Sequence, residues 1–205
     1  MADPQPYVAK LIPSLIAVPA AQAGVCAVCR SSSEHERCQQ CGDALRLLGW
    51  LPDVLPIALM TAESPLYEAL RGYKNSSSDA VRRRHRLTGA ALLATFARDH
   101  SHCLGEFDSV TAIPSVRRSA VEELIALVRD LRERDAPALV AATAWIGRTV
   151  DPSRYAVSRD VAGERILVVD DTFTSGATMF SACTTLREAG AEVVGPIAIG
   201  RFPAA

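Results

Sequence analysis

A short run near the carboxyl end combines two carboxylates, several hydroxyls and a glycine. It reads Val168-Val169-Asp170-Asp171-Thr172-Phe173-Thr174-Ser175-Gly176-Ala177-Thr178. Residues 165 to 169 are apolar and rich in β-branched side chains, which is typical of a strand buried on both faces of a parallel sheet. A helix is predicted from about residue 176 to 189. The free backbone N–H groups at its start would favour a bound anion, most naturally a phosphate monoester.

The other side chains of this run predict what is attached to the phosphate. Gly176 lets the backbone approach it closely, and Thr174, Ser175 and Thr178 can add hydroxyl donors. The acidic pair stands one sugar's length away, where it can accept hydrogen bonds from ribose hydroxyls or face a Mg²⁺ that those hydroxyls share. We therefore expect a ribose 5-phosphate site. The alternative is that the acidic pair only caps the helix.

Other phosphate-site motifs do not fit. A nucleotide P-loop needs a lysine after its glycines, and no lysine follows Lys74. The G-x-G-x-x-G spacing of dinucleotide sites is absent from the sequence. A phosphorelay receiver would need a further Asp and a Lys after the acidic pair, and the remaining residues contain neither.

A second group of residues has metal-ligand spacing. Two C-x-x-C pairs separated by eight residues are formed by Cys26, Cys29, Cys38 and Cys41. Two such pairs supply the four-sulfur tetrahedral shell that structural zinc prefers, and so small a segment would need the metal to stay folded. The alternatives are two disulfides or unrelated buried thiols.

The remaining cysteines and the loop between the pairs are expected to be structural. Residues 31 to 37 are polar and predict a solvated connection, with His35 a bystander because four thiolates complete the shell. Cys103 and Cys183 lie in apolar surroundings and are predicted to be core residues.

Composition limits the class of protein. The 205 residues carry a formal net charge of −1 and are 49% hydrophobic, which excludes a disordered or coiled-coil chain and gives no overall attraction to nucleic acid or anionic membrane. No stretch reaches the ~20 apolar residues of a membrane helix. Residues 10 to 23 superficially resemble a signal peptide, but Asp3, Pro13 and Pro19 argue against one. We expect a cytoplasmic protein.

The elements that must position these residues follow from periodicity. Residues 49 to 65 contain three prolines and are predicted to be a connector. Helices are expected from Asp79 onward and over 119–134, and strands over 109–113, 138–143, 165–169 and 193–199. Residues 170 to 175 are predicted to be a polar loop, and Gly190 to cap the helix before it. The β-loop-α-β unit at the end predicts parallel strands with the ligand at their carboxyl ends.

Three segments together resemble a known family. Leu167 to Thr178 looks like the phosphoribosyl pyrophosphate (PRPP) loop of type I phosphoribosyltransferases. The paired cysteine motifs and Tyr67-Glu68-Ala69-Leu70-Arg71-Gly72-Tyr73-Lys74 narrow the resemblance to the branch around competence protein ComF. The segment from Phe107 to Pro114 is similar to the strand and proline that lead into that family's next loop. The resemblance covers residues 26 to 201.

The resemblance implies a fold, a reaction and site residues. The fold would be α/β, a parallel sheet of about five strands flanked by helices, with a small N-terminal four-cysteine zinc-ribbon-like module; residues 24–45 would form the module and 60–205 the phosphoribosyltransferase-like domain. Phosphoribose would pass from PRPP to an unidentified nitrogen acceptor with Mg²⁺, while zinc is structural. The implied catalytic pair is Asp170 and Asp171. The implied phosphate-binding residues are Thr172, Thr174, Ser175, Gly176, Ala177 and Thr178. The candidates for binding pyrophosphate are Arg117, Arg118 and Lys74, whose alternative role is a solvated basic surface.

The chain departs from the family after Pro114. Relatives often carry an arginine followed closely by Arg-Gly-Phe-Asn-Gln, whereas this chain reads Ser115-Val116-Arg117-Arg118-Ser119-Ala120. A later basic segment is also thin, with Arg148, Arg154 and Arg159. The sugar-phosphate end of the site therefore matches the family better than the pyrophosphate and acceptor ends.

A second hypothesis is that the fold serves as a non-catalytic, ComF-like accessory protein that binds single-stranded DNA during DNA uptake. Residues 71 to 86 hold six basic residues against one acidic residue, Asp79. The basic residues are Arg71, Lys74, Arg82, Arg83, Arg84 and Arg86. Such a patch could contact phosphates, and its alternative is a solvated helix face without a partner.

Overall fold

A four-stranded parallel sheet lies at the centre of the structure, a computed structural model that describes residues 8–114, 121–143 and 148–203. Within those residues the strand order is β1–β6–β5–β2. These strands are β1 (Leu55–Leu59), β2 (Ser109–Ala112), β5 (Arg165–Phe173) and β6 (Glu192–Arg201). Two short strands, β3 (Leu139–Ala141) and β4 (Tyr155–Val157), pair antiparallel in a separate sheet. The predicted α/β class with a parallel sheet is confirmed, although residues 138–143 do not join the parallel sheet.

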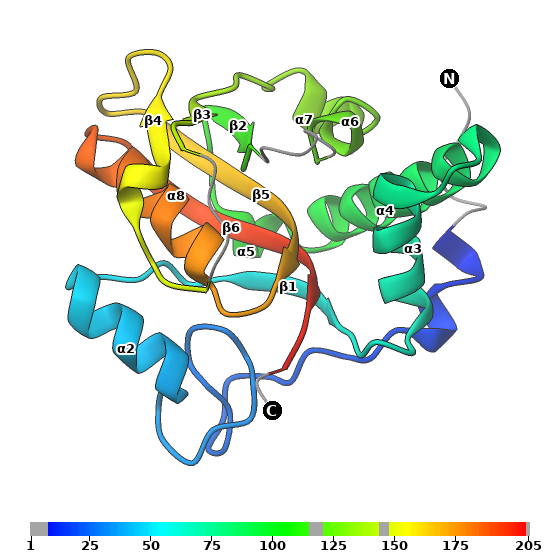
Figure 1. Ribbon diagram of the computed structural model, residues 1–205, viewed down its shortest axis with the longest axis horizontal. Coiled ribbons are helices and arrows are strands. Elements are labelled where there is room, and N and C mark those ends of the chain that lie inside the picture. The colour runs from blue at the N-terminus through cyan, green and yellow to red at the C-terminus, as the bar shows by residue number, and fades with distance from the viewer. Residues whose placement is uncertain (1–7, 115–120, 144–147, 204–205) are drawn as a thin grey trace.

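Helices cover both faces of the sheet (Figure 1). On one face lie α3 (Pro65–Asn75), α4 (Asp79–Asp99), α6 (Val121–Ile125) and α7 (Arg129–Arg132). On the other lie α8 (Ala177–Glu188) and, below it in Figure 1, α2 (Gln39–Leu48). The short pieces are η1 (Ile12–Ser14), α5 (Ser101–Leu104) and η2 (Pro152–Arg154). None of the helices in the described ranges is both long and apolar enough to cross a membrane.

Strand β5 is buried on both faces, as its apolar run predicts. Leu167 and Val169 pack among the side chains of α3, α4 and α6, whereas Ile166 and Val168 pack among those of α8. All four are 0% exposed. Because successive side chains of a strand point to opposite faces, one continuous apolar run can join both halves of the core.

The strand continues further than predicted. Residues 170 to 173 were expected in a loop, but they remain paired with β6, with Asp170 beside Ala198 and Thr172 beside Gly200. The acidic pair therefore lies in the last paired residues of β5, where hydrogen bonds to β6 fix the backbone.

Strand β1 occupies part of the predicted connector, so that prediction was wrong for residues 55 to 59. Pro56 argues against a strand at the level of sequence, because proline cannot donate to a sheet ladder. β1 is an edge strand that pairs along its length with β6. On its other side the described residues form only an isolated bridge, in which the N–H of Leu59 donates to the carbonyl of Ile16 at 2.9 Å, so most of that side needs no partner. Its alternate residues Pro56 and Ala58 are buried.

One of the predicted helices begins where expected, whereas another is divided in two. α4 begins at Asp79 as predicted, with the Ser78 hydroxyl accepting the N–H of Val81. The expected helix over 119–134 is instead two short ones, because Val128 adopts an extended conformation between them. Its apolar stripe is still buried in the core. At the end of α8, Gly190 has φ +89° and donates to the carbonyl of Arg187 at 2.9 Å, which confirms the predicted cap.

Candidate functional site

The two acidic residues of β5 have different surroundings. Asp170 is half-buried, whereas Asp171 is 2% exposed. The backbone N–H of Asp171 donates to Oδ1 of Asp170 at 2.8 Å. Alternation along the strand directs Asp171 toward the face covered by α3 and Asp170 toward the face covered by α8. The pair thus presents its carboxylates to two sides of the strand end.

Helix α3 supplies the partners of Asp171. Oδ2 of Asp171 accepts a hydrogen bond from the hydroxyl of Tyr73 and forms an ion pair with Nζ of Lys74. Burial, reinforced by the negative charge of Asp171, raises the pKa of Tyr73 well above its ordinary value, so its hydroxyl stays protonated and donates. The start of α3 is fixed by Ser64, whose hydroxyl accepts the N–H of Tyr67 at 3.3 Å. These contacts hold the Asp171 carboxylate in one orientation.

Asp170 carries a perturbed carboxyl group. Burial, with the nearby charge of Asp171 adding to it, raises the pKa of Asp170 to about 7, and Lys74 opposes the shift. Any cation or hydrogen-bond donor that enters the site would stabilise the ionised form of this carboxyl. Perturbed carboxyls of this kind cluster at functional sites.

The turn after β5 is built around Gly176. This glycine has φ +81° and precedes the first residue of α8. A Cβ atom here would lie 2.7 Å from Cζ of Phe173 and 2.9 Å from Cδ2 of Phe180, closer than side chains tolerate. The two rings meet edge to face with centroids 5.5 Å apart. They leave room only for glycine, and the turn brings the first N–H groups of α8 beside the end of the strand.

A cavity of about 280 Å³ opens at the carboxyl ends of β2 and β5. This volume is near the lower end of the range for small-molecule sites. Its lining includes the predicted residues Lys74, Asp170, Asp171, Thr172 and Thr178. The other described lining residues are Ile113, Pro114, Ala141, Thr143, Arg154 and Tyr155.

Some predicted residues lie elsewhere. Thr174, Ser175, Gly176 and Ala177 form the turn into α8 and are not among the described residues that line the cavity. Arg117 and Arg118 fall outside the described residues. The structure therefore brings the acidic pair, two threonines and Lys74 together around one cavity.

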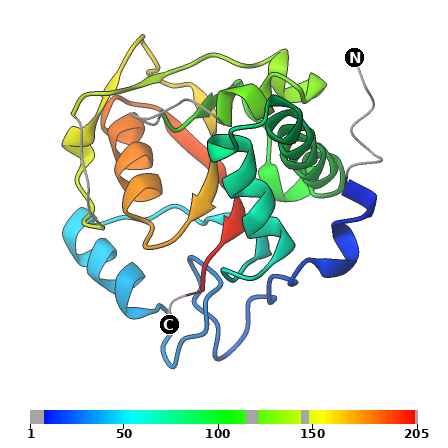
Figure 2. The ribbon, with the colours of Figure 1, turned by 45° about the vertical axis from the view of Figure 1, so that its right-hand side comes forward.

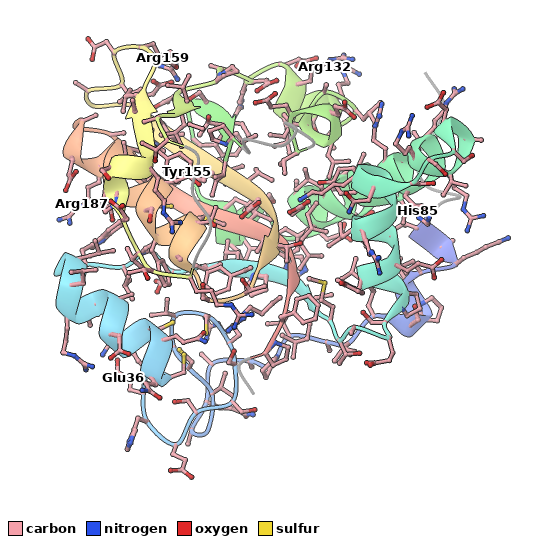
Figure 3. All side chains as sticks on the ribbon, viewed as in Figure 1. Glu36, His85, Arg132, Tyr155, Arg159 and Arg187 are labelled. Carbon is pink, nitrogen blue, oxygen red and sulfur yellow. The ribbon has the colours of Figure 1, made fainter. Side chains whose placement is uncertain are left out.

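Arg154 and Tyr155 are two of the lining residues that were not predicted as site candidates. Arg154 is 4% exposed and its Nη2 donates to the carbonyl of Thr149 at 2.7 Å. Tyr155 comes from β4 beside α8 (Figure 3). Burial and the charge of Asp170 raise the pKa of Tyr155 to about 12, so it enters the cavity as a neutral hydroxyl. The sequence offered only the sparse arginines of this region as a signal.

The four clustered cysteines converge on one point. The sulfur atoms of Cys26, Cys29, Cys38 and Cys41 all lie within 4.8 Å of one another, and all four residues are buried. They are free thiols, and Sγ of Cys29 and Cys38 are 3.7 Å apart. With Zn–S bonds of about 2.3 Å, sulfurs at tetrahedral corners would be roughly 3.8 Å apart. This donor set fits zinc, and Figure 3 shows the sulfur atoms gathered between α2 and the loop before it.

Two expectations about the loop between the cysteine pairs and about the remaining cysteines were wrong. Ser31 was placed in a solvated connection, but it is 1% exposed and accepts a hydrogen bond from Nη2 of Arg201 at 2.6 Å. Cys103 was expected in the core, but it is exposed, and its thiol lies within 4.8 Å of the imidazoles of His100 and His102. Cys183 is buried as predicted. His35 is exposed and outside the four-sulfur group, as expected.

Comparison with known proteins gives short matches in sequence. No family model matches the chain. Adenine phosphoribosyltransferase of Kineococcus radiotolerans is 61% identical over 33 residues, which is 16% of this chain and 18% of that protein. Orotate phosphoribosyltransferase of Streptomyces avermitilis is 53% identical over 36 residues, which is 18% of this chain and 20% of that protein. The match thus spans about a fifth of either relative.

Solved structures show distant similarity. Adenine phosphoribosyltransferase from Leishmania tarentolae aligns over 70% of this chain and 90% of its own, with 12% identity and a TM-score of 0.43. A phosphoribosyltransferase from Corynebacterium diphtheriae aligns over 79% and 83%, with 24% identity and a TM-score of 0.40. UMP synthase from Leishmania donovani aligns over 56% and 23%, with 21% identity and a TM-score of 0.34. The short sequence matches are likewise to phosphoribosyltransferases.

Proposed function

We propose that this chain binds PRPP and transfers its phosphoribosyl group to a nitrogen acceptor. The observation that carries the proposal is the position of Asp170 and Asp171 at a cavity whose wall continues into the start of α8. A phosphate at that helix start would lie one sugar's length from the carboxylates. The short identities to adenine and orotate phosphoribosyltransferases support the same substrate class.

Each group then has a role. The acidic pair accepts hydrogen bonds from the ribose hydroxyls, and the turn from Thr174 to Thr178 binds the 5-phosphate. Tyr73 and Lys74 fix the Asp171 carboxylate, and Lys74 also contributes positive charge to the cavity. Mg²⁺, when bound, neutralises pyrophosphate. The carboxylate oxygens of the cavity are ligands that this ion accepts. Arg117 and Arg118 stay candidates for the pyrophosphate.

The reaction would be a substitution at the anomeric carbon. The acceptor nitrogen forms a bond to C1 of the ribose while the C1–O bond to pyrophosphate breaks, and the electron pair leaves with pyrophosphate. The nitrogen then loses a proton. Positive charge that develops on the sugar ring is stabilised by the nearby carboxylates. We place this chemistry in residues 60–205 together with β1, which pairs with β6 in the same sheet, and assign residues 24–45 to a module stabilised by zinc.

A pyrophosphate-release assay tests turnover. The zinc-loaded chain is incubated with PRPP and Mg²⁺, with adenine, orotate or ammonium as acceptor. We expect release with at least one nitrogen acceptor and loss of release in Asp170→Asn/Asp171→Asn. Asp108→Asn is the matched control, because Asp108 pairs with Arg165 at the opposite end of β5. Release that persists in the double variant would contradict the proposed site.

A second candidate function is binding of single-stranded DNA, in a ComF-like accessory role. Half of the basic patch is already paired: Lys74 with Asp171, Arg82 with Asp79, and Arg86 with Glu123. The exposed arginines that remain are Arg71, Arg83 and Arg84. Anisotropy titration of a labelled oligothymidine across salt concentrations tests this role, which predicts a steep salt slope that Arg83→Ala/Arg84→Ala reduces. Salt-independent or absent binding would contradict it.

A further inference from the structure

A fully buried arginine joins the cysteine cluster to the turn after β5. Arg201 is the last residue of β6 and is 0% exposed. Its backbone lies between β1 and β5, beside Leu59 on one side and Phe173 on the other. Figures 1 and 2 both show this end of β6 running into the loops that carry the cysteines. The side chain therefore leaves the sheet where the two regions meet.

The two edges of the guanidinium group bind different parts of the chain. Toward the cysteine cluster, Nε donates to the carbonyl of Cys29 at 3.3 Å, and Nη2 donates to Sγ of Cys29 at 3.3 Å and to Oγ of Ser31 at 2.6 Å. Toward the turn, Nη1 donates to the carbonyls of Phe173 at 3.3 Å and Thr174 at 2.6 Å. Nη1 also donates to the carbonyl of Phe202. One planar group thus holds both segments at once.

The ring of Phe173 extends this link into the turn after β5. The guanidinium carbon of Arg201 lies 4.7 Å from the centre of that ring. The same ring packs on Phe180 and limits the space at Gly176. The carbonyl of Thr174, which Arg201 binds directly, belongs to the backbone of the turn. Movement of the guanidinium would therefore release two points of the turn.

The charge of Arg201 requires an anionic partner. Among the described residues, no carboxylate lies within 4.0 Å of its guanidinium nitrogens, so its contacts there are carbonyls, a hydroxyl and the Cys29 sulfur. A buried cation without a counter-charge is costly. Four thiolates around Zn²⁺ carry a net charge of −2, which supplies that counter-charge. An N–H···S bond from outside the metal shell is how proteins orient such ligands.

We propose that Arg201 is a positioning residue that couples metal binding at the four cysteines to the conformation of the turn from Thr174 to Thr178. The thiolates of the loaded cluster anchor one edge of the guanidinium, and the other edge holds the carbonyls of Phe173 and Thr174. Without the metal, nothing holds the Cys29 sulfur in place against the other three sulfurs. The contacts of Arg201 with Cys29 then loosen, and the turn loses its anchor. That the turn takes a 5-phosphate rests on the proposed function, whereas the coupling itself does not.

Hydrogen exchange of the full-length chain tests the coupling without a substrate. The measurement uses a Cys103→Ser background, because the exposed group of His100, His102 and Cys103 could bind added zinc. We expect removal of zinc by a chelator under reducing conditions to accelerate, at least tenfold, the exchange of the amides that are hydrogen-bonded at the turn. These are the amides of Ala177, on Oγ of Ser175, of Phe180, on the carbonyl of Gly176, and of Phe202, on the carbonyl of Phe173. Unchanged protection of these amides, with faster exchange confined to residues 24–45, would overturn the proposal.

Arg201→Lys keeps the charge but loses the planar fork that spans both segments. We expect the zinc-loaded variant to show fast exchange of the amides of Ala177, Phe180 and Phe202 already, and zinc removal to add less than twofold. We also expect it to release zinc to a colorimetric chelator at least threefold faster. The matched control is Arg159→Lys, a half-buried arginine held by Glu164 and Ser109 at the opposite end of the molecule (Figure 3). If zinc removal unfolds the whole chain, the zinc-loaded Arg201→Lys decides alone, and wild-type protection of its turn overturns the proposal.

Calorimetric titration with ribose 5-phosphate separates this proposal from the proposed function. We expect the zinc-loaded chain to bind and Arg201→Lys to bind at least tenfold more weakly. If neither binds while the exchange results hold, the proposed function fails and the coupling stands. If both bind equally and both turns are equally protected, the coupling fails and the proposed function stands.

Discussion

Replacement of Gly176 by alanine would strain the turn in two separate ways. At φ +81° an L-residue costs about 1–2 kcal/mol relative to glycine. The added Cβ would also lie 2.7 Å from the ring of Phe173, and overpacking of this kind costs about 1–3 kcal/mol. We therefore expect the free energy of unfolding to fall by about 2–5 kcal/mol. For a chain of this size, each kcal/mol lowers the melting temperature by roughly 2–4 °C.

Gly163→Ala separates the two causes. Gly163 has a similar φ of +75°, but nothing lies within 4 Å of the position that a Cβ would take. It should therefore lose only the conformational part, about 1–2 kcal/mol. Denaturant unfolding of both variants measures the difference, which we expect to be about 1–3 kcal/mol. Equal losses in the two variants would refute the claim that Phe173 and Phe180 restrict the turn to glycine.

Three further predictions concern the site and the cysteines. Tyr73→Phe removes a donor to a buried carboxylate and should lower the free energy of unfolding by about 1.5–3 kcal/mol. The control is Tyr67→Phe, which should change the free energy of unfolding little, because the Tyr67 hydroxyl has no hydrogen bond within the described residues. Equal losses in the two variants would contradict the role of Tyr73. Because the pKa of Asp170 is raised to about 7 on folding, the folded state holds its proton more tightly, and this contribution to stability is lost as pH rises from about 4 to 7. Denaturation in Mg²⁺-free buffer should therefore show Asp170→Asn gaining stability relative to wild type over that window, and a constant difference would contradict the shift. A chelator should lower the melting temperature of the wild type and of Cys103→Ser but not of Cys38→Ser, whereas an equal response of all three would argue against metal at the four cysteines.

The sequence predicted what local pattern determines. The apolar run of β5, the helix after it and the cap at Gly190 all follow from neighbouring residues, and the structure confirms them. The convergence of the four cysteines also follows from local spacing. The boundary of β5 was misplaced because Asp170 and Asp171 look like loop residues, and only pairing with β6 keeps them in the strand.

The local sequence pattern could not predict contacts between segments that are far apart in the chain. Tyr73 and Asp171 are 98 residues apart, and Cys29 and Arg201 are 172 residues apart. Tyr73 lies in a segment that carries the family resemblance, but nothing in the sequence around Tyr73 or Arg201 indicates which distant residue either one contacts. Their roles arise because parallel strands bring their carboxyl ends to one edge of the sheet, where segments from the whole chain meet. Strand β1 was missed for a related reason, since only its edge position tolerates Pro56.

Calorimetric titration of the zinc-loaded chain with PRPP and Mg²⁺ tests the central claim most directly. Our account predicts saturable binding that is lost in Asp170→Asn/Asp171→Asn and retained in Asp108→Asn. The reason is that Asp170 and Asp171 line the cavity, whereas Asp108 does not. Absence of binding at millimolar PRPP, or equal binding by the wild type and the double variant, would contradict it.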